Sequence, residues 1–548
     1  GLRCFSGGFR LFDFGAGEHP VMGPQSNRVV TRSLADGWLP IVHYQWETGQ
    51  IRYEQTSVAT PLMCDIGSLQ TETGTETVVL ATRFELLNRS QEERDAWLWM
   101  EISRPTPCRL TLQNLLVLSR PSDKSHRSGF LPLRCRFDIH DKGALDIAVL
   151  EPGGPGSYRQ DLPNPSSARE AVRYRVRLAP GERHAIDLFV PYVELMDKQE
   201  LQALLEMSFT NVAASVERFW RDRVSRGMTY EVPDRYLNEL FKANLWHVLI
   251  STDIDPFTRQ YQHGAATHHY KNYLNETAMV ARSLEMRGEH EAAAQLIETF
   301  LANQGVKGLP GNFRSKEGVL YAAHPEEPDP YTAQGYNMHH GFGMWAAAEH
   351  YLWTRDIRYL ARVAPRLLAA ADWVINERQS TKITDPAGRR RPEFGLAPAG
   401  DLEDVEEYLY YYATDAYYHL GMKRVAQAFA EAIDDASELP AAARPPDRWT
   451  SEVRTAAKRL IKETESFRQD IRASVAESVA TSPVVRLRDG LYIPYVPSRV
   501  YALTHLKEGW IREGLYPALH LVTGEVYEPQ HQFVDWMIHE LEDNVFIS

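Results

Sequence analysis

The spacing of apolar residues changes once along the chain, near residue 198, and this change limits the possible folds most. Before it, short stretches alternate between apolar and polar residues, and 174–178 and 186–190 do so on either side of a Pro180-Gly181 turn. Such alternation predicts strands with one buried face, here joined as a hairpin. After residue 198, apolar residues recur at helical spacing almost to the end. A run of strands followed by a run of helices predicts a β region and a separate α region.

We therefore predict a multidomain β + α protein. An antiparallel β-sandwich is expected over 1–197, a linker helix over 198–232, and an (α/α) hairpin barrel or toroid over 233–548. Helices are predicted at 234–251, 273–287, 289–304, 337–354, 357–378, 407–434, 449–477, 509–523 and 529–542.

Long and short connections alternate between these helices. The long ones, at 252–272, 306–336, 379–406 and 478–508, are rich in His, Tyr, Arg, Pro and carboxylates. Structureless connections of this length are uncommon and usually functional. In a ring of helical hairpins, alternation places every long loop at the same end, so that end is predicted to carry the function.

Three local patterns match this organisation: an inner helix at Tyr273–Gly288, a "G-x-P" loop after Gln304, and a second hairpin about Trp353–Asp356. Together with the β region, they resemble the six-hairpin glycosidases, the (α/α)6-barrel glycoside hydrolases and phosphorylases of the glucoamylase-like and α-L-rhamnosidase-like families. The resemblance implies hydrolysis of a glycosidic bond, with inversion. About nine helices precede Ser548, whereas such a ring needs about twelve. Either the chain is incomplete or the toroid closes differently. The resemblance places the catalytic base in the last hairpin, which would then follow Ser548.

The densest group of carboxylates lies between Gly395 and Tyr408, where the third long loop is expected to enter a helix. Glycoside hydrolysis needs one carboxylic acid to protonate the leaving oxygen and a second carboxylate. The resemblance places the general acid in this loop, at Asp404, with Glu403 and Asp401 as the next candidates. The alternative is that these acidic residues only stabilise a helix N-terminus.

Two further clusters, at 261–276 and 331–341, have the polar and aromatic residues of a sugar subsite. The alternative is that these residues only pack within polar inner helices. Glucoamylase-like sequences carry an Arg-Asp pair near Asn275-Glu276, and its absence here leaves glucose specificity unsupported. Arg314 is a candidate to bind a substrate carboxylate, or else pairs with the acidic run at 324–329. The predicted substrate-binding residues are His268, His269, Tyr270, Asn275, Glu276, Arg314, Tyr336, Asn337, His339, His340, Glu407 and Tyr408.

Composition and missing motifs exclude several other classes. The net charge of −13 argues against nucleic acid as a partner, and no apolar run is long enough for a transmembrane helix. The sequence has no Walker A loop, dinucleotide fingerprint, G-x-S-x-G or kinase signature. The histidines lack H-E-x-x-H spacing, so we predict no metal and no cofactor. The predicted partner is a carbohydrate substrate, and the oligomeric state stays open.

Three alternatives to hydrolysis stay open. A polysaccharide lyase on a similar toroid would abstract a proton from a uronic acid with a Tyr or His, and phosphorolysis would need phosphate. A protein without catalysis would only bind sugar. A polymeric substrate would favour a secreted or periplasmic protein over a cytoplasmic one.

Overall fold

The computed structural model divides into two compact units, Gly1–His247 and Val248–Ser548. The predicted antiparallel β region and helical region are both confirmed. The domain boundaries predicted at residues 197 and 232 stay predictions. The structure describes residues 2–5, 9–20, 29–68, 76–102, 108–111, 114–118, 133–150, 169–193, 195, 197–255, 258–264, 272–322, 336–402, 405–440, 444–502 and 517–546.

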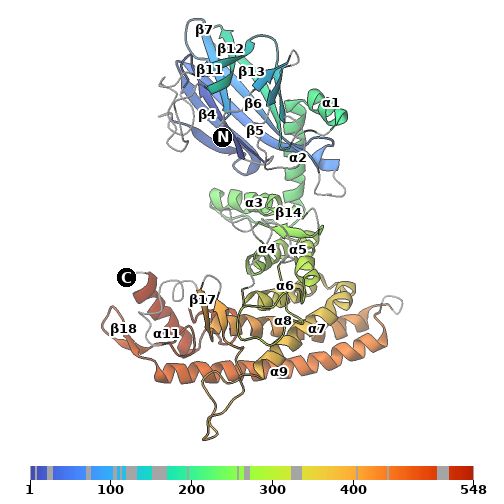
Figure 1. The fold of residues 1–548 in the computed structure, drawn as a ribbon, viewed down its shortest axis with the longest axis vertical. Helices are drawn as coiled ribbons and strands as arrows, with labels where there is room; N and C mark the ends of the chain where they lie inside the picture. Colours follow the sequence, from blue (N-terminus) through green and yellow to red (C-terminus); the bar gives the residue numbers. More distant parts are fainter. Residues whose placement is uncertain are drawn as a thin grey trace, which may run out of the picture. The chain divides into compact units, whose positions relative to one another are not determined.

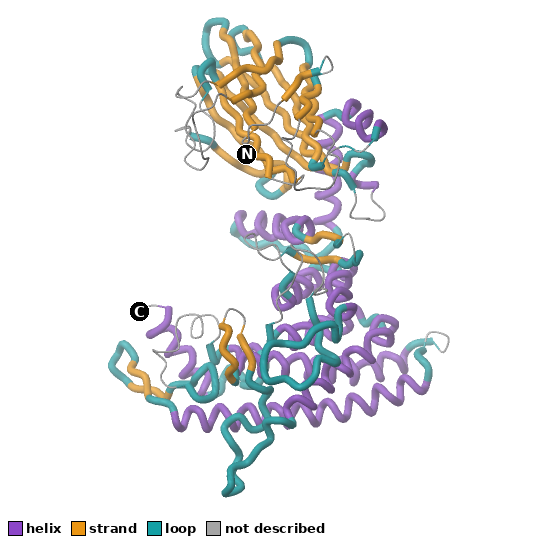
Figure 2. The backbone as a smooth tube through the Cα atoms, in the orientation of Figure 1, coloured by secondary structure: helices purple, strands orange, loops and turns teal. Residues whose placement is uncertain are grey.

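The first unit contains two antiparallel sheets (Figures 1 and 2). The five-stranded sheet has the order β1 (Leu2–Phe5), β2 (Phe9–Ala16), β7 (Arg94–Ile102), β12 (Arg169–Leu178) and β11 (Ala144–Leu150). The eight-stranded sheet has the order β3 (Thr31–Ala35), β4 (Leu39–Thr48), β5 (Ile51–Pro61), β6 (Val78–Asn88), β13 (Arg183–Pro191), β10 (Leu133–Ile139), β9 (Leu115–Leu118) and β8 (Cys108–Leu110).

One hydrophobic core joins the two sheets, because alternate residues of each strand point inward. Leu98 and Met100 of β7 face this core together with Phe84 and Leu86 of β6. The segment predicted as one linker helix contains two, α1 (Lys198–Glu206) and α2 (Phe209–Ser225). Helix α3 (Arg235–Ile250) follows.

The second unit is mostly helical (Figure 2). Its contacts define two rows of helices: in one row α4 packs on α6, α6 on α8, and α8 on α10, while in the other α5 packs against α4 and α6, α7 against α6 and α8, and α9 against α8. We call the first row the inner helices. The elements are β14 (Thr252–Ile254), β15 (Tyr261–His263), α4 (Leu274–Met286), α5 (His290–Ala302), α6 (His339–Thr354), α7 (Ile357–Arg378), β16 (Gly400–Leu402), β17 (Val405–Leu409), α8 (Tyr412–Glu438), α9 (Asp447–Thr481), β18 (Val484–Arg486), β19 (Tyr492–Pro494), α10 (His520–Thr523) and α11 (Gln532–Glu540), followed by a π-helical turn (Leu541–Phe546).

Local chemistry explains the tight turns between paired helices. Arg355 ends α6 in the left-handed conformation with φ of 56°. Asp356 then caps α7, since its side chain accepts from the N–H groups of Arg358 and Tyr359. Among the described helices, none carries an apolar stretch long enough to cross a lipid bilayer.

One predicted boundary is wrong in a way that affects the site. The helix expected from residue 407 begins at Tyr412, and Val405–Leu409 instead forms strand β17. This strand pairs antiparallel with β16 through Gly400–Leu409 and Leu402–Val405. The aromatic and β-branched residues of this stretch favour a strand, and the pairing with β16 is a contact that helical spacing alone does not reveal.

Candidate functional site

The described parts of the four long loops of the second unit are linked to one another near the starts of the inner helices, as their alternation predicts. Each loop bonds to the next: Asn272 Nδ2 donates to Ala322 O (2.7 Å), Gly311 forms a β-bridge with Gly400, and Tyr411 forms one with Arg499. The β16–β17 hairpin lies within this group of contacts, immediately before α8.

The base of the hairpin is fixed against α6. Asn337, which precedes α6, donates from Nδ2 to the Asp401 carbonyl oxygen (2.8 Å). The Asp401 N–H in turn donates to Pro310 O (3.3 Å) in the second loop. A Cβ at Gly400 would lie 2.0 Å from Asn337 Nδ2, so only glycine permits this approach.

The predicted acid segment is only partly described. Asp401 lies on β16 and is buried, with 8% of its surface exposed. Asp404 and Glu403 lie outside the described residues. Glu407 and Tyr408 lie on β17 and are exposed. The described carboxylates of this segment, Asp401 and Glu407, therefore lie on strands and outside the first turn of α8, whose acidic residue is Asp415. Stabilisation of a helix N-terminus does not explain these two residues.

Asp415 was not singled out by the sequence pattern, because it follows a run of tyrosines that reads as helix packing. It is buried in the first turn of α8, and its Oδ1 accepts from the Ala397 N–H (2.8 Å). Burial raises the pKa of Asp415 to about 7, although this hydrogen bond and the charge of Arg378 act to lower it. The signal available in the sequence is a lone carboxylate among apolar residues in Tyr412–Tyr418.

The two histidines that open α6 have different environments. His340 is fully buried, and its Nδ1 accepts from the Leu320 N–H (3.1 Å) while Nε2 donates to Ala370 O (3.1 Å). Both nitrogens are thus committed to the fold, and burial lowers the pKa of His340 to about 4. His339 is also buried, its pKa is lowered to about 3, and its Nε2 has no hydrogen-bond partner among the described residues. It is a neutral imidazole that can bond to a ligand.

Aromatic residues line the starts of α4 and α6. Tyr273 and Tyr336 stack with ring centroids 6.0 Å apart and planes 6° apart, and the His339 ring meets Tyr336 edge-on at 5.0 Å. Asn275 is buried in the first turn of α4, whereas Glu276 is exposed there. The predicted residues His268, His269 and Tyr270 lie outside the described residues.

Arg314 has a partner within the fold. The N–H groups of Arg314 and Ser315 donate to the Glu377 carboxylate (3.0–3.1 Å), and the Arg314 guanidinium lies 3.6 Å from the same group. The acidic run at 324–329 that was considered as its partner lies outside the described residues. Since 54% of its side chain is exposed, Arg314 can still bind an anion at the loop end.

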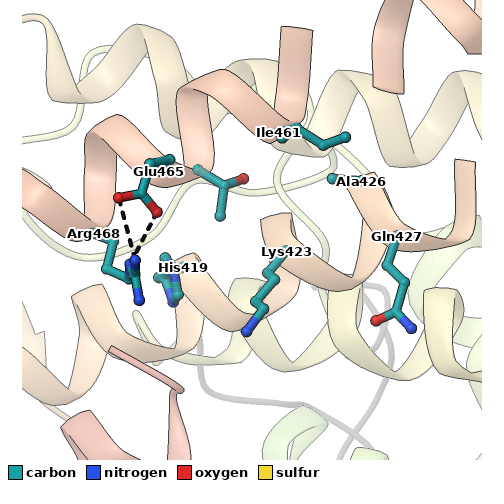
Figure 3. A pocket seen from close by; sticks show the side chains of 8 residues that line it. His419, Lys423, Ala426, Gln427, Ile461, Glu465 and Arg468 are labelled. Atoms are coloured by element: carbon teal, nitrogen blue, oxygen red, sulfur yellow. Dashed lines mark hydrogen bonds and ion pairs between the residues drawn. The ribbon is translucent and has the colours of Figure 1, made fainter. Parts of the chain in front are cut away.

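A separate cavity of about 540 Å³ lies between α8 and α9 (Figure 3). None of the predicted site residues lines it. Arg468 pairs with Glu465 at 3.0 Å, and His419 bonds to Gly524 O, so these groups already have partners within the fold. The residues that line this cavity are His419, Lys423, Ala426, Gln427, Ile461, Thr464, Glu465 and Arg468.

In the described part of the chain, one group of side chains has metal-ligand spacing. Asp138, His140 and Asp187 of the first unit place ligand atoms within 4.8 Å of one another. Both oxygens of Asp187, however, accept from the Arg83 guanidinium (2.7 and 2.8 Å). A cation here would have to displace that guanidinium, so the group reads as an ion-pair network.

No protein-family model and no curated protein matches this sequence. Among solved structures, a bacterial glucoamylase complexed with acarbose is similar with a TM-score of 0.46 and 10% identity, over 90% of this chain and 64% of that chain. A family GH92 inverting mannosidase from Bacteroides thetaiotaomicron is similar with a TM-score of 0.32 and 9% identity, over 84% of this chain and 55% of that chain. This chain therefore spans less than two thirds of the length of either structure.

Proposed function

We propose that this protein is a glycoside hydrolase that cleaves a glycosidic bond in an oligo- or polysaccharide. One observation carries the proposal: the carboxylate-bearing hairpin of β16 and β17 is joined to the second long loop by the Gly311–Gly400 bridge, and directly after it Tyr411 is joined to the fourth long loop at Arg499. A rigid element carrying carboxyl groups beside aromatic rings is what protonation of a glycosidic oxygen requires.

In this proposal the general acid comes from the 401–407 segment. Asp404 donates the proton to the leaving oxygen, and Glu403 and Asp401 are the next candidates for this role. Tyr273 and Tyr336 offer ring faces for stacking on a sugar, while His339 and Asn337 bond to its hydroxyl groups. The resemblance of the sequence to six-hairpin glycosidases supports an inverting mechanism, in which a second carboxylate activates water.

The proposal extends to the architecture. The two rows of helices are part of an (α/α) barrel of the six-hairpin type, with the site at the end where the long loops gather. A polymeric substrate would place the protein outside the cytoplasm, as a secreted or periplasmic enzyme. For the lyase alternative His340 is unsuited as the base, because both of its ring nitrogens are hydrogen-bonded within the fold, whereas His339 remains a candidate.

The test is incubation with a panel of plant, algal and bacterial polysaccharides and oligosaccharides, read by release of reducing ends and by ultraviolet absorbance. Reducing ends without absorbance support hydrolysis. Absorbance of an unsaturated product identifies a lyase, and dependence on phosphate identifies a phosphorylase. Binding without product contradicts an enzyme.

A further inference from the structure

The segment 395–402, which leads into the proposed acid hairpin, is buried throughout. Buried peptide groups need hydrogen-bond partners, and a loop does not supply them from its own backbone. Here helices α7 and α8, together with the residues just outside α6 and α7, supply them through buried side chains. Arg378 Nε donates to Gly395 O (2.6 Å), Thr381 Oγ1 to Leu396 O (2.6 Å) and Asn337 Nδ2 to Asp401 O (2.8 Å), while Asp415 Oδ1 accepts from Ala397 N–H (2.8 Å).

Asp415 differs from the other three because it accepts. Among the described residues it is the one side chain that satisfies a backbone N–H of this segment. A buried N–H that loses its acceptor costs about 1–3 kcal/mol, which is enough to favour another arrangement of the loop.

We infer that Asp415 is a positioning residue that holds in place the segment 395–402, whose last three residues form strand β16 of the proposed acid hairpin and include Asp401. This inference rests on the proposed function only for its effect on turnover. The hydrogen bond to Ala397 exists whatever the reaction is.

The charged surroundings of Asp415 come from three helices. Arg378 of α7 is fully buried, stacks 3.8 Å above the Phe467 ring, and pairs with Asp470 of α9 at 3.0 Å. On α8 itself, Tyr412 and Tyr418 are the neighbouring titratable groups, and both are buried. Because the carboxyl and the carboxylate of Asp415 both keep an oxygen that can accept from Ala397, an amide at this position should do the same.

The experiment is hydrogen–deuterium exchange on the full chain with three variants. Asp415→Ala removes the acceptor, and Asp415→Asn keeps one. Asp435→Ala is the matched control, because Asp435 lies near the other end of α8, where it accepts from the Tyr351 hydroxyl. Asp435→Ala therefore weakens α8 without reaching the segment.

We expect amide exchange in 395–402 to be at least about tenfold faster in Asp415→Ala, and unchanged in Asp415→Asn and Asp435→Ala. With a substrate from the panel, kcat of Asp415→Ala falls about 100-fold at nearly constant KM, and Asp415→Asn restores it. Unchanged exchange in 395–402, or equal loss of protection in both alanine variants, overturns the inference. If exchange in 395–402 is faster only in Asp415→Ala but the wild-type protein turns over no substrate, the inference is supported and the result counts against the proposed function alone.

Discussion

At the scale of single residues, two carboxyl groups are buried among the inner helices, Asp415 of α8 and Glu285 of α4. Asp415 has a pKa of about 7 in the folded chain against an ordinary value of 3.8. Glu285 lies between two histidines, and each of its oxygens faces an imidazole Nδ1, that of His290 or that of His350. Burial raises the pKa of the first group, whereas the second accepts hydrogen bonds from two imidazoles.

The raised pKa of Asp415 predicts that its burial costs more as pH rises. Below about pH 4 both folded and unfolded chains carry its proton, and between about pH 4 and 7 the unfolded chain releases it first. Stability from this group is therefore lost as pH rises to about 7. Urea titrations should show Asp415→Asn gaining more than about 1 kcal/mol relative to wild type from pH 4 to pH 8. A difference that stays constant with pH would contradict this.

Glu285→Ala should lower the free energy of unfolding by about 3 kcal/mol, because it leaves the buried His350 and its neighbour His290 without their acceptor. Chemical denaturation measures this. Glu291→Ala, an exposed change in the first turn of α5, is the control and should stay within about 0.5 kcal/mol of wild type. Equal effects of both substitutions would show that the contacts of Glu285 with His290 and His350 do not stabilise the fold.

At the scale of elements, hydrophobic periodicity predicted most of the helices well. The predicted range of α7, 357–378, is the observed one. Its start is marked in the sequence by Arg355 and by the capping residue Asp356. The start of α8 was missed because Val405–Leu409 pairs with β16, and helical spacing in the sequence does not show such a pairing. Asp415 was missed for a related reason: a sequence pattern shows helical spacing, but not which turn lies against a buried loop.

The crossing of α6 and α8 depends on two glycines. A Cβ at Gly341 would lie 2.4 Å from the Tyr417 backbone, and one at Gly421 would lie 2.6 Å from Gly341 O. Gly→Ala normally stabilises a helix by about 1 kcal/mol. Here we expect Gly341→Ala to be destabilising, lowering the free energy of unfolding by about 2 kcal/mol or more, because the added Cβ overpacks the helix contact. Gly343→Ala is the control, because its Cβ would lie nearest to side-chain atoms of Leu320, at 2.8 and 3.2 Å, and not to backbone. Thermal unfolding of both variants measures the difference, and stabilisation by Gly341→Ala would refute the close crossing.

At the scale of the whole molecule, the two compact units are expected to unfold in separate transitions. Calorimetry is expected to show two transitions. Leu86→Ala, in the core of the first unit, should lower the midpoint temperature of one transition, and Gly341→Ala should lower that of the other. A single transition shifted by both substitutions would contradict two independent units.

The central claim is that the 401–407 segment protonates the glycosidic oxygen, and one comparison tests it most directly. Asp404→Asn, with Glu403→Gln and Asp401→Asn alongside, is assayed on a natural glycoside and on an aryl glycoside whose leaving group needs no proton. The account predicts that Asp404→Asn lowers kcat about 10²–10⁴-fold on the natural substrate and changes it little on the activated aryl glycoside. Full activity of all three variants on the natural substrate would contradict it.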